Sequence, residues 1–183
     1  MTITILPYSP DWPRWFDTLL PILRRAAPDA LIHHIGSTAV PGLVAKPIID
    51  VQVTIPDLAA FDPAPFLREG FTLKTPVTDH QPPGMSLPPD DLKKRLFGLT
   101  QPHPANVHIR EAGRFNQRYP LLCRDYLRSH PRAAAAYGEI KRQLARRFPE
   151  DVEAYYDIKD PVFDIIMAGA EDWARATGWM PDP

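Results

Sequence analysis

The segment over residues 48–55, Ile-Ile-Asp-Val-Gln-Val-Thr-Ile, constrains the fold more than any other part of the chain. It is rich in β-branched residues, which favour an extended, pleated backbone. Apolar side chains occupy positions that point to both faces of such a strand, at Ile48, Ile49, Val51, Val53 and Ile55. Because strands that are apolar on both faces are typical of the interior of a sheet, the segment predicts a central strand.

The other elements follow in an order that indicates an α+β protein. Residues 10–27 carry apolar side chains at helical spacing, and residues 31–35 form a short apolar run that ends at Gly36. A helix is expected at 57–69, and the pattern after Gly113 is helical. Further short strands are expected at 71–75, 95–100 and 106–110. The order predicts a small mixed sheet of about four or five strands, packed against helices gathered on one side and at one end.

Composition indicates a single globular domain. The chain has 183 residues, of which 44% are hydrophobic and 23% charged. We expect a sheet core over about residues 1–110 and a helical region over about 113–178. Cys123 is the only cysteine, and we find neither a leader nor a run of about 18 apolar residues. These features predict a cytoplasmic protein that does not cross a membrane.

Charge is balanced overall but uneven along the chain. The net charge is −1, which argues against a general nucleic-acid binder. Residues 110–147 contain ten basic and three acidic side chains, whereas residues 150–183 contain two basic and nine acidic ones. Two interpretations stay open: helices that neutralise each other, or a basic face that attracts phosphate.

The densest candidate site is the segment 34–52, His-Ile-Gly-Ser-Thr-Ala-Val-Pro-Gly-Leu-Val-Ala-Lys-Pro-Ile-Ile-Asp-Val-Gln. Gly36 allows the backbone to approach a ligand closely. The N–H groups of Ser37 and Thr38 that follow it suit an anion-binding concavity. Taken alone, Gly36 and Gly42 equally fit ordinary turns. We expect no serine nucleophile, because no neighbouring residue in the sequence supplies a base for Ser37.

The second half of this segment carries a lysine and an acid. Lys46 is not a P-loop lysine, because Pro47 follows it where that motif needs Ser or Thr. Asp50 and Gln52 lie two positions apart on a strand and therefore share a face. The segment thus predicts a cleft in which a phosphate-binding turn and Lys46 face Asp50.

A resemblance to the GrpB family follows from these residues. The segment from His34 to Leu43 and the Ala-Lys-Pro-Ile-Ile-Asp run that ends at Asp50 resemble that family's signature. Further matching residues extend over nearly the whole chain, at Val107-His108-Ile109, Arg124-Asp125-Tyr126-Leu127-Arg128, Pro131, Tyr137, Lys141, Tyr155 and Lys159.

The resemblance implies a nucleotidyltransferase fold similar to the DNA polymerase beta superfamily, in which a Gly-Ser turn is paired with strand carboxylates. Asp50 matches the first carboxylate, but Gln52 stands where the second is expected. A third acid is expected on the neighbouring strand, where the face of His108 carries Asn106 and Arg110 instead. One carboxylate holds divalent cations weakly, so we expect Mg²⁺ at Asp50 only together with a bound phosphate ligand.

Basic side chains near the predicted cleft suit an anionic ligand. Besides Lys46, Arg110 is a candidate contact, and His108 is either a general base or ligand contact or a structural histidine. Arg124 and Arg128 lie one helical turn apart and are a candidate phosphate clamp, or else form salt bridges to Asp125 or to the acidic C-terminal segment.

The sequence therefore predicts a nucleotidyltransferase-like protein that binds a nucleotide or another phosphorylated small molecule, with nucleotidyl transfer as its candidate activity. The alternative is a binding or accessory module with reduced catalysis. Some relatives are fused to dephospho-coenzyme A kinase, which the resemblance offers as a link to coenzyme A. A structural or interaction role of the charged helices is the third hypothesis.

Overall fold

The computed structural model describes residues 2–74 and 78–182. The helices are α1 (Asp11–Ala26), α2 (Ala64–Arg68), α3 (Phe115–Ser129), α4 (Pro131–Arg147) and α5 (Val152–Thr177), with short 3-10 turns η1 (Ser37–Ala39) and η2 (Pro89–Leu92). The strands are β1 (Leu31–Ile35), β2 (Ile49–Ile55), β3 (Thr72–Leu73), β4 (Arg95–Leu99) and β5 (Ala105–Glu111). No helix within these ranges is both long and apolar enough to cross a membrane.

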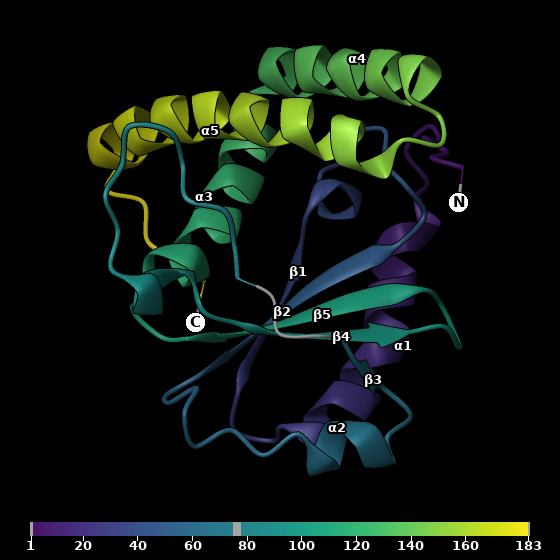
Figure 1. Cartoon of the computed structure of the whole chain (residues 1–183), viewed down its shortest axis with the longest axis vertical. Coiled ribbons are helices and arrows are strands. Elements are labelled where there is room, and N and C mark those ends of the chain that lie inside the picture. The colour runs from purple at the N-terminus through teal and green to yellow at the C-terminus, as the bar shows by residue number, and fades with distance from the viewer. Residues whose placement is uncertain (1, 75–77, 183) are drawn as a thin grey trace.

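The strands form one mixed sheet in the order β1-β2-β5-β4-β3 (Figure 1). Strand β2 pairs with β1 in antiparallel and with β5 in parallel orientation, so Asp50 lies beside both Ile35 and Asn106. The predictions of an α+β fold and of an internal strand at 48–55 are therefore confirmed. The predicted strands at 95–100 and 106–110 are also confirmed, as β4 and β5.

One face of the sheet builds the main apolar core. Trp12, Leu19 and Leu23 of α1 pack with Ile49 and Val51 of β2, and all five side chains are almost fully buried. Burial of each such side chain contributes about 1.5–3 kcal/mol to folding. The prediction that β2 is apolar on both faces is wrong, because its alternate residues are the polar side chains at 50, 52 and 54.

The C-terminal helices lie across the polar face and one end of the sheet (Figure 1). Tyr119 and Cys123 of α3 pack against Met167 of α5 in a second apolar cluster. Because α1 packs on the opposite face, the expected gathering of helices on one side is corrected. Arg118 of α3 forms an ion pair with Glu171 of α5, so the basic and acidic segments do neutralise each other in part.

The helix expected at 57–69 forms only over Ala64–Arg68. The Asp57 side chain accepts hydrogen bonds from the backbone N–H groups of Ala59 and Ala60, and Asp62 accepts one from Ala64. Such local bonds offer the backbone an alternative to helix. The strand expected at 71–75 is shortened to Thr72–Leu73, and Thr75 lies outside the described residues.

Candidate functional site

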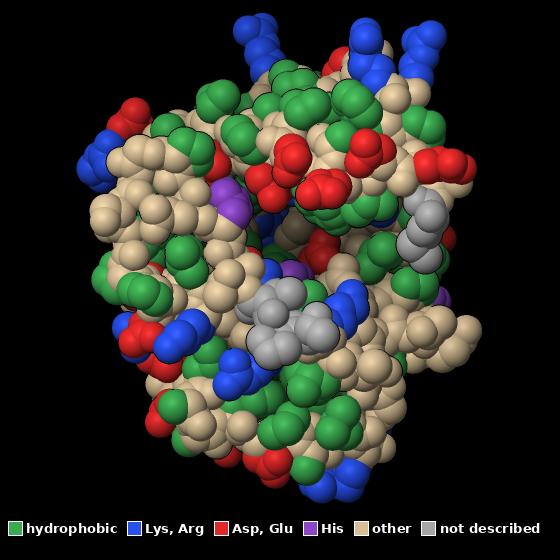
Figure 2. Space-filling model, in the orientation of Figure 1, with side chains coloured by type: hydrophobic (Ala, Val, Ile, Leu, Met, Phe, Trp, Pro, Cys, Tyr) green, Lys and Arg blue, Asp and Glu red, His purple; other side chains and the backbone are tan. Residues whose placement is uncertain are grey.

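A cavity of about 610 Å³ lies between the polar face of the sheet, the turn at η1 and the C-terminal helices. Figure 2 shows its mouth as a hollow with basic, acidic and histidine side chains inside. Of the residues predicted for the site, it is lined by Gly36, Ser37, Thr38, Lys46, Asp50, His108, Arg110 and Arg124. The structure therefore brings most of the predicted site residues to one place.

Gly36 allows the turn after β1 to pack closely against the carboxylate of Asp50. Its φ is +71°, and a Cβ placed on it would lie 2.6 Å from Oδ2 of Asp50. Only glycine fits this conformation and this approach without strain. The prediction that Gly36 and Asp50 face one cleft is confirmed by this contact and by the pairing of Ile35 with Asp50.

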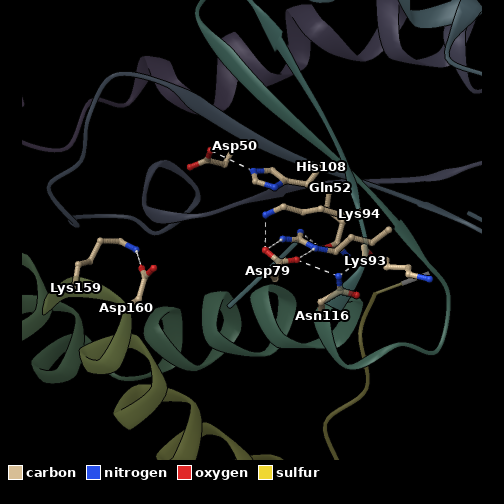
Figure 3. A network of polar contacts seen from close by, with 10 residues as sticks. Asp50, Gln52, Asp79, Lys93, Lys94, His108, Asn116, Lys159 and Asp160 are labelled. Atoms are coloured by element: carbon tan, nitrogen blue, oxygen red, sulfur yellow. Dashed lines mark hydrogen bonds and ion pairs between the residues drawn. The ribbon is translucent and has the colours of Figure 1, made fainter. Parts of the chain in front are cut away.

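Asp50 and His108 lie next to each other in the cavity lining (Figure 3). Asp50 Oδ1 accepts a hydrogen bond from the Asn106 amide at 3.1 Å and lies 3.8 Å from Nε2 of His108. Burial acts to raise the pKa of Asp50, but His108, Asn106 and Lys46 outweigh it and lower that pKa. Burial lowers the pKa of His108 to about 4, so the pair is a carboxylate and a neutral imidazole at neutral pH.

Lys141 of α4 is a site residue that sequence reasoning missed. Its Nζ donates hydrogen bonds to Oγ of Ser37 at 2.7 Å and to the carbonyl oxygen of Val44 at 2.5 Å. Burial, reinforced by the charge of Lys159, lowers the pKa of Lys141 to about 7. Ser37 therefore has an amine neighbour that the local sequence did not reveal, although Lys141 belonged to the family resemblance.

Two lysines outside the helices and strands, Lys46 before β2 and Lys74 after β3, also line the cavity. Lys46 Nζ donates to the Tyr156 hydroxyl at 2.7 Å and lies 4.7 Å from the centre of that ring. Lys74 Nζ donates to Oδ1 of Asn106 at 2.7 Å. The predicted place of Lys46 at the cleft is thus observed, whereas Lys74 was not foreseen.

Asp79 is an acid that the sequence did not place in the cleft. Its carboxylate accepts from Lys94 Nζ at 2.5 Å, from the Arg110 guanidinium at 3.0 and 3.1 Å and from the Asn116 amide at 3.0 Å. Burial acts to raise the pKa of Asp79, but the charges of Arg110 and Lys94 hold it well below its usual range. The same Arg110 donates to Oε1 of Gln52 at 2.9 Å (Figure 3).

Comparison with known proteins places the chain in a family. The model of the family described as GrpB protein matches residues 2–168. This chain belongs to the GrpB family. The crystal structure of the conserved protein GrpB from Enterococcus faecalis is 29% identical and superposes with a TM-score of 0.72, over 93% of this chain and 99% of that one.

Two curated relatives of this GrpB-family chain are informative. UPF0157 protein PA4798 of Pseudomonas aeruginosa is 39% identical over 92% of this chain and 67% of its own length. A dephospho-CoA kinase of Mycolicibacterium paratuberculosis is 33% identical over 98% of this chain, and this chain spans 48% of that kinase. Weaker structural matches include RNA terminal uridylyl transferases, at 20% identity or less and TM-scores below 0.5, which are too distant to carry an argument.

Two of the predicted phosphate contacts have structural partners in the GrpB-family chain. Arg124 is 4% exposed and donates to the Asp125 carboxylate and to the carbonyl oxygen of His34. Arg128 lies outside the cavity lining and donates to Ala39 and Asp125. These contacts are the salt-bridge alternative of the sequence analysis, and the phosphate clamp stays a prediction.

The side chains around Asp50 fit a pair of divalent cations poorly. Two-metal phosphoryl transfer relies on several carboxylates that share the ions. Gln52 is fully buried and bound to Arg110, and no cluster of three or more His, Cys, Asp or Glu suited to a metal occurs within residues 2–74 and 78–182. Asp50, with the neighbouring Asn106 and His108, offers ligands for one ion at most.

Proposed function

We propose that this chain binds a nucleotide or another phosphorylated small molecule in the cavity between the sheet and helices α4 and α5. The observation that carries the proposal is a set of three lining lysines, Lys46, Lys74 and Lys141, whose Nζ atoms donate to uncharged oxygens. Within the described residues, none of the three forms an ion pair with a carboxylate. Clustered amines on a concave surface attract an anion, and phosphate oxygens accept from them in charge-assisted hydrogen bonds.

The shape and the remaining polarity of the cavity support the same ligand class. Its volume of about 610 Å³ lies in the range typical of sites for small molecules. Nε2 of His108, which lies on the Asp50 side of the ring, adds a polar group to the lining. Tyr155 and Tyr156 add aromatic surface beside Lys46.

A second candidate function is an accessory binding module for a coenzyme A precursor. The relative named dephospho-CoA kinase favours it, because this chain matches only about half of that protein's length. In this function the cavity holds the phosphates of the precursor, and the chemistry takes place elsewhere. Asp50 and its neighbours offer ligands for one ion at most, which agrees with such a module better than with nucleotidyl transfer.

A thermal-shift panel tests the proposal. The probes are the common nucleoside triphosphates, coenzyme A, dephospho-coenzyme A and phosphopantetheine, each with and without Mg²⁺. A ligand at 100 times its Kd stabilises the native state by about 2.7 kcal/mol, which raises Tm by roughly 5–10 °C. The absence of any shift across the panel would contradict the proposal, and a preference for the pantetheine compounds would favour the accessory module.

A matched pair of variants locates the site. Lys46→Met removes a lining amine and keeps an unbranched side chain, so it should diminish the shift. Lys93→Met is the control, because Lys93 is an exposed lysine outside the cavity lining whose Nζ lies 2.6 Å from Asp90. Equal effects of both variants would show that binding depends on overall charge and not on this cavity.

A further inference from the structure

The guanidinium of Arg110 donates a hydrogen bond to the amide oxygen of Gln52, which lies two positions after Asp50 on strand β2. Gln52 is fully buried, and its Oε1 accepts from Nη1 of Arg110 at 2.9 Å. Its Nε2 donates to the carbonyl oxygen of Gln117 at 2.9 Å, which fixes the orientation of the amide. The oxygen that a cation would need at this position therefore already contacts a fixed positive charge.

The carboxylate of Asp79, a second acid in the cavity lining, also has basic partners already. Asp79 accepts from Lys94, Arg110 and Asn116, and its side chain is 20% exposed (Figure 3). A divalent ion at Asp79 would have to displace two ammonium or guanidinium partners and would lie close to both. Asp160, the third lining acid, is paired with Lys159 at 2.8 Å.

Asp50 is thus the lining acid that has no lysine or arginine partner within the described residues. Three lysines that lack an acid partner, Lys46, Lys74 and Lys141, surround the same space. Among the described residues, this cavity therefore has more amines without an acid partner than carboxylates without a basic partner. The excess positive charge belongs to the protein itself, so a phosphate ligand would meet it without bringing a metal ion.

We propose, on the basis of the proposed function, that phosphate groups bind in this cavity without a divalent cation, with Lys46, Lys74 and Lys141 in the electrostatic role of metal ions. An Mg²⁺ ion on the ligand neutralises the phosphate charges that these side chains attract. It also brings a hydrated cation next to fixed amines, since Mg²⁺ usually keeps several waters. Mg²⁺ therefore competes with the protein for the phosphate oxygens.

Calorimetric titration of the whole chain with ATP tests this inference in two buffers, one containing EDTA and one containing excess MgCl₂ at equal ionic strength. The expected affinity in EDTA is about tenfold higher, which corresponds to the loss of about 1.4 kcal/mol of charge-assisted contact in Mg²⁺. Equal affinities also support metal-independent binding. Binding that requires Mg²⁺, or is tighter in it, would overturn the inference and leave the proposed function intact.

The variant Asp50→Asn gives an independent readout. In a metal-independent site Asp50 repels the phosphate, so the variant should bind ATP in EDTA about threefold to tenfold more tightly. In a metal-dependent site the same change removes the principal ligand, and binding in Mg²⁺ would be lost while wild type retains it. If neither protein binds ATP or any compound of the thermal-shift panel in either buffer, the proposed function itself fails.

Discussion

Lys141 donates a hydrogen bond from Nζ to Oγ of Ser37, which lies 104 residues earlier in the chain, across 2.7 Å. The contact joins helix α4 to the turn that follows β1. Close packing supports it, because a Cβ on Gly138 of α4 would lie 3.3 Å from Leu43 and Val44. The cavity is therefore complete only when the C-terminal helices are docked on the loop between β1 and β2.

Replacement of Lys141 by methionine should weaken ligand binding. Hydrogen bonds to charged groups contribute about 1.5–3 kcal/mol, so the Kd for ATP should rise by about 10- to 100-fold at pH 7. Calorimetric titration of the variant checks this, with Lys93→Met as the control that keeps the cavity unchanged. A loss of less than threefold would show that Lys141 only supports the loop.

Ligand binding should also depend on pH through Lys141. Its pKa is lowered to about 7, mainly by burial and then by the charges of Lys159 and Lys46, against the opposing effect of Asp50. A bound anion favours the protonated amine, so binding takes up a proton when the pH is above about 7. The affinity for ATP should fall between pH 7.5 and 9, by at most about tenfold per pH unit.

This pH profile has a direct comparison. The Lys141→Met variant lacks the titrating amine, so its affinity should change little over the same range. If wild type gives a flat profile between pH 7.5 and 9, the amine stays in one protonation state and its linkage to the ligand is absent.

The free energy of unfolding should also depend on pH through Lys141. The folded-state pKa of Lys141 lies below its ordinary value of 10.5, so the unfolded chain binds more protons between about pH 7 and 10. The contribution of this group to stability therefore rises with pH across that window. Urea denaturation of wild type and Lys141→Met at pH 7 and 9 measures this effect. The free energy of unfolding should increase more with pH for wild type than for the variant, and equal increases would contradict the lowered pKa of Lys141.

Gly36 and Gly42 provide a matched pair for the contact with Asp50. Both have positive φ, +71° and +79°, but a Cβ at Gly36 would lie 2.6 Å from Asp50, whereas a Cβ at Gly42 would have no neighbour within 4 Å among the described residues. Gly42→Ala should therefore cost the backbone strain of about 1–2 kcal/mol. Gly36→Ala should cost about 1–3 kcal/mol more, because overpacking is added. Urea denaturation measures both, and equal losses would contradict a tight contact between the turn and Asp50.

Local pattern made much of the sheet predictable. The β-branched run at 48–55 predicts an internal strand, and the Gly-Ser turn close to Asp50 follows from the family resemblance and the two-residue strand period. The helix at 57–69 was overestimated, because helical composition says nothing of the turns that Asp57 and Asp62 make with the backbone. The true face polarity of β2 was readable from its alternation of polar and apolar residues.

The chemistry of the site was harder to predict, because its partners are distant in sequence. Lys141 and Ser37 lie in segments with no common local pattern, and Asp79 lies in a stretch of sequence with no recognisable motif. The pairing of Arg110 with Gln52 depends on the parallel register of β2 and β5, which a single sequence does not fix. Charge counting from the sequence therefore underestimated both the acids and the amines of the cavity.

Alanine variants of Arg124 and Arg128 should differ in their effect on stability. Arg124 is 4% exposed and bound to Asp125, and loss of one member of a buried pair costs about 3–5 kcal/mol. Arg124→Ala should therefore lower the free energy of unfolding by about that amount. Arg128 has a side chain that is 39% exposed, so Arg128→Ala should cost about 1 kcal/mol or less. Urea denaturation distinguishes these values.

The affinity of the same variants decides the clamp prediction. The guanidinium of Arg128 donates to the carbonyl oxygen of Ala39 and to Asp125, outside the cavity lining. Arg128→Ala, which should remain folded, is therefore expected to bind ATP within about threefold of wild type, whereas Lys46→Met should lose about tenfold. A tenfold loss for Arg128→Ala would instead mean that this guanidinium turns toward a bound phosphate, and the pair of arginines would then be a clamp as the sequence suggests.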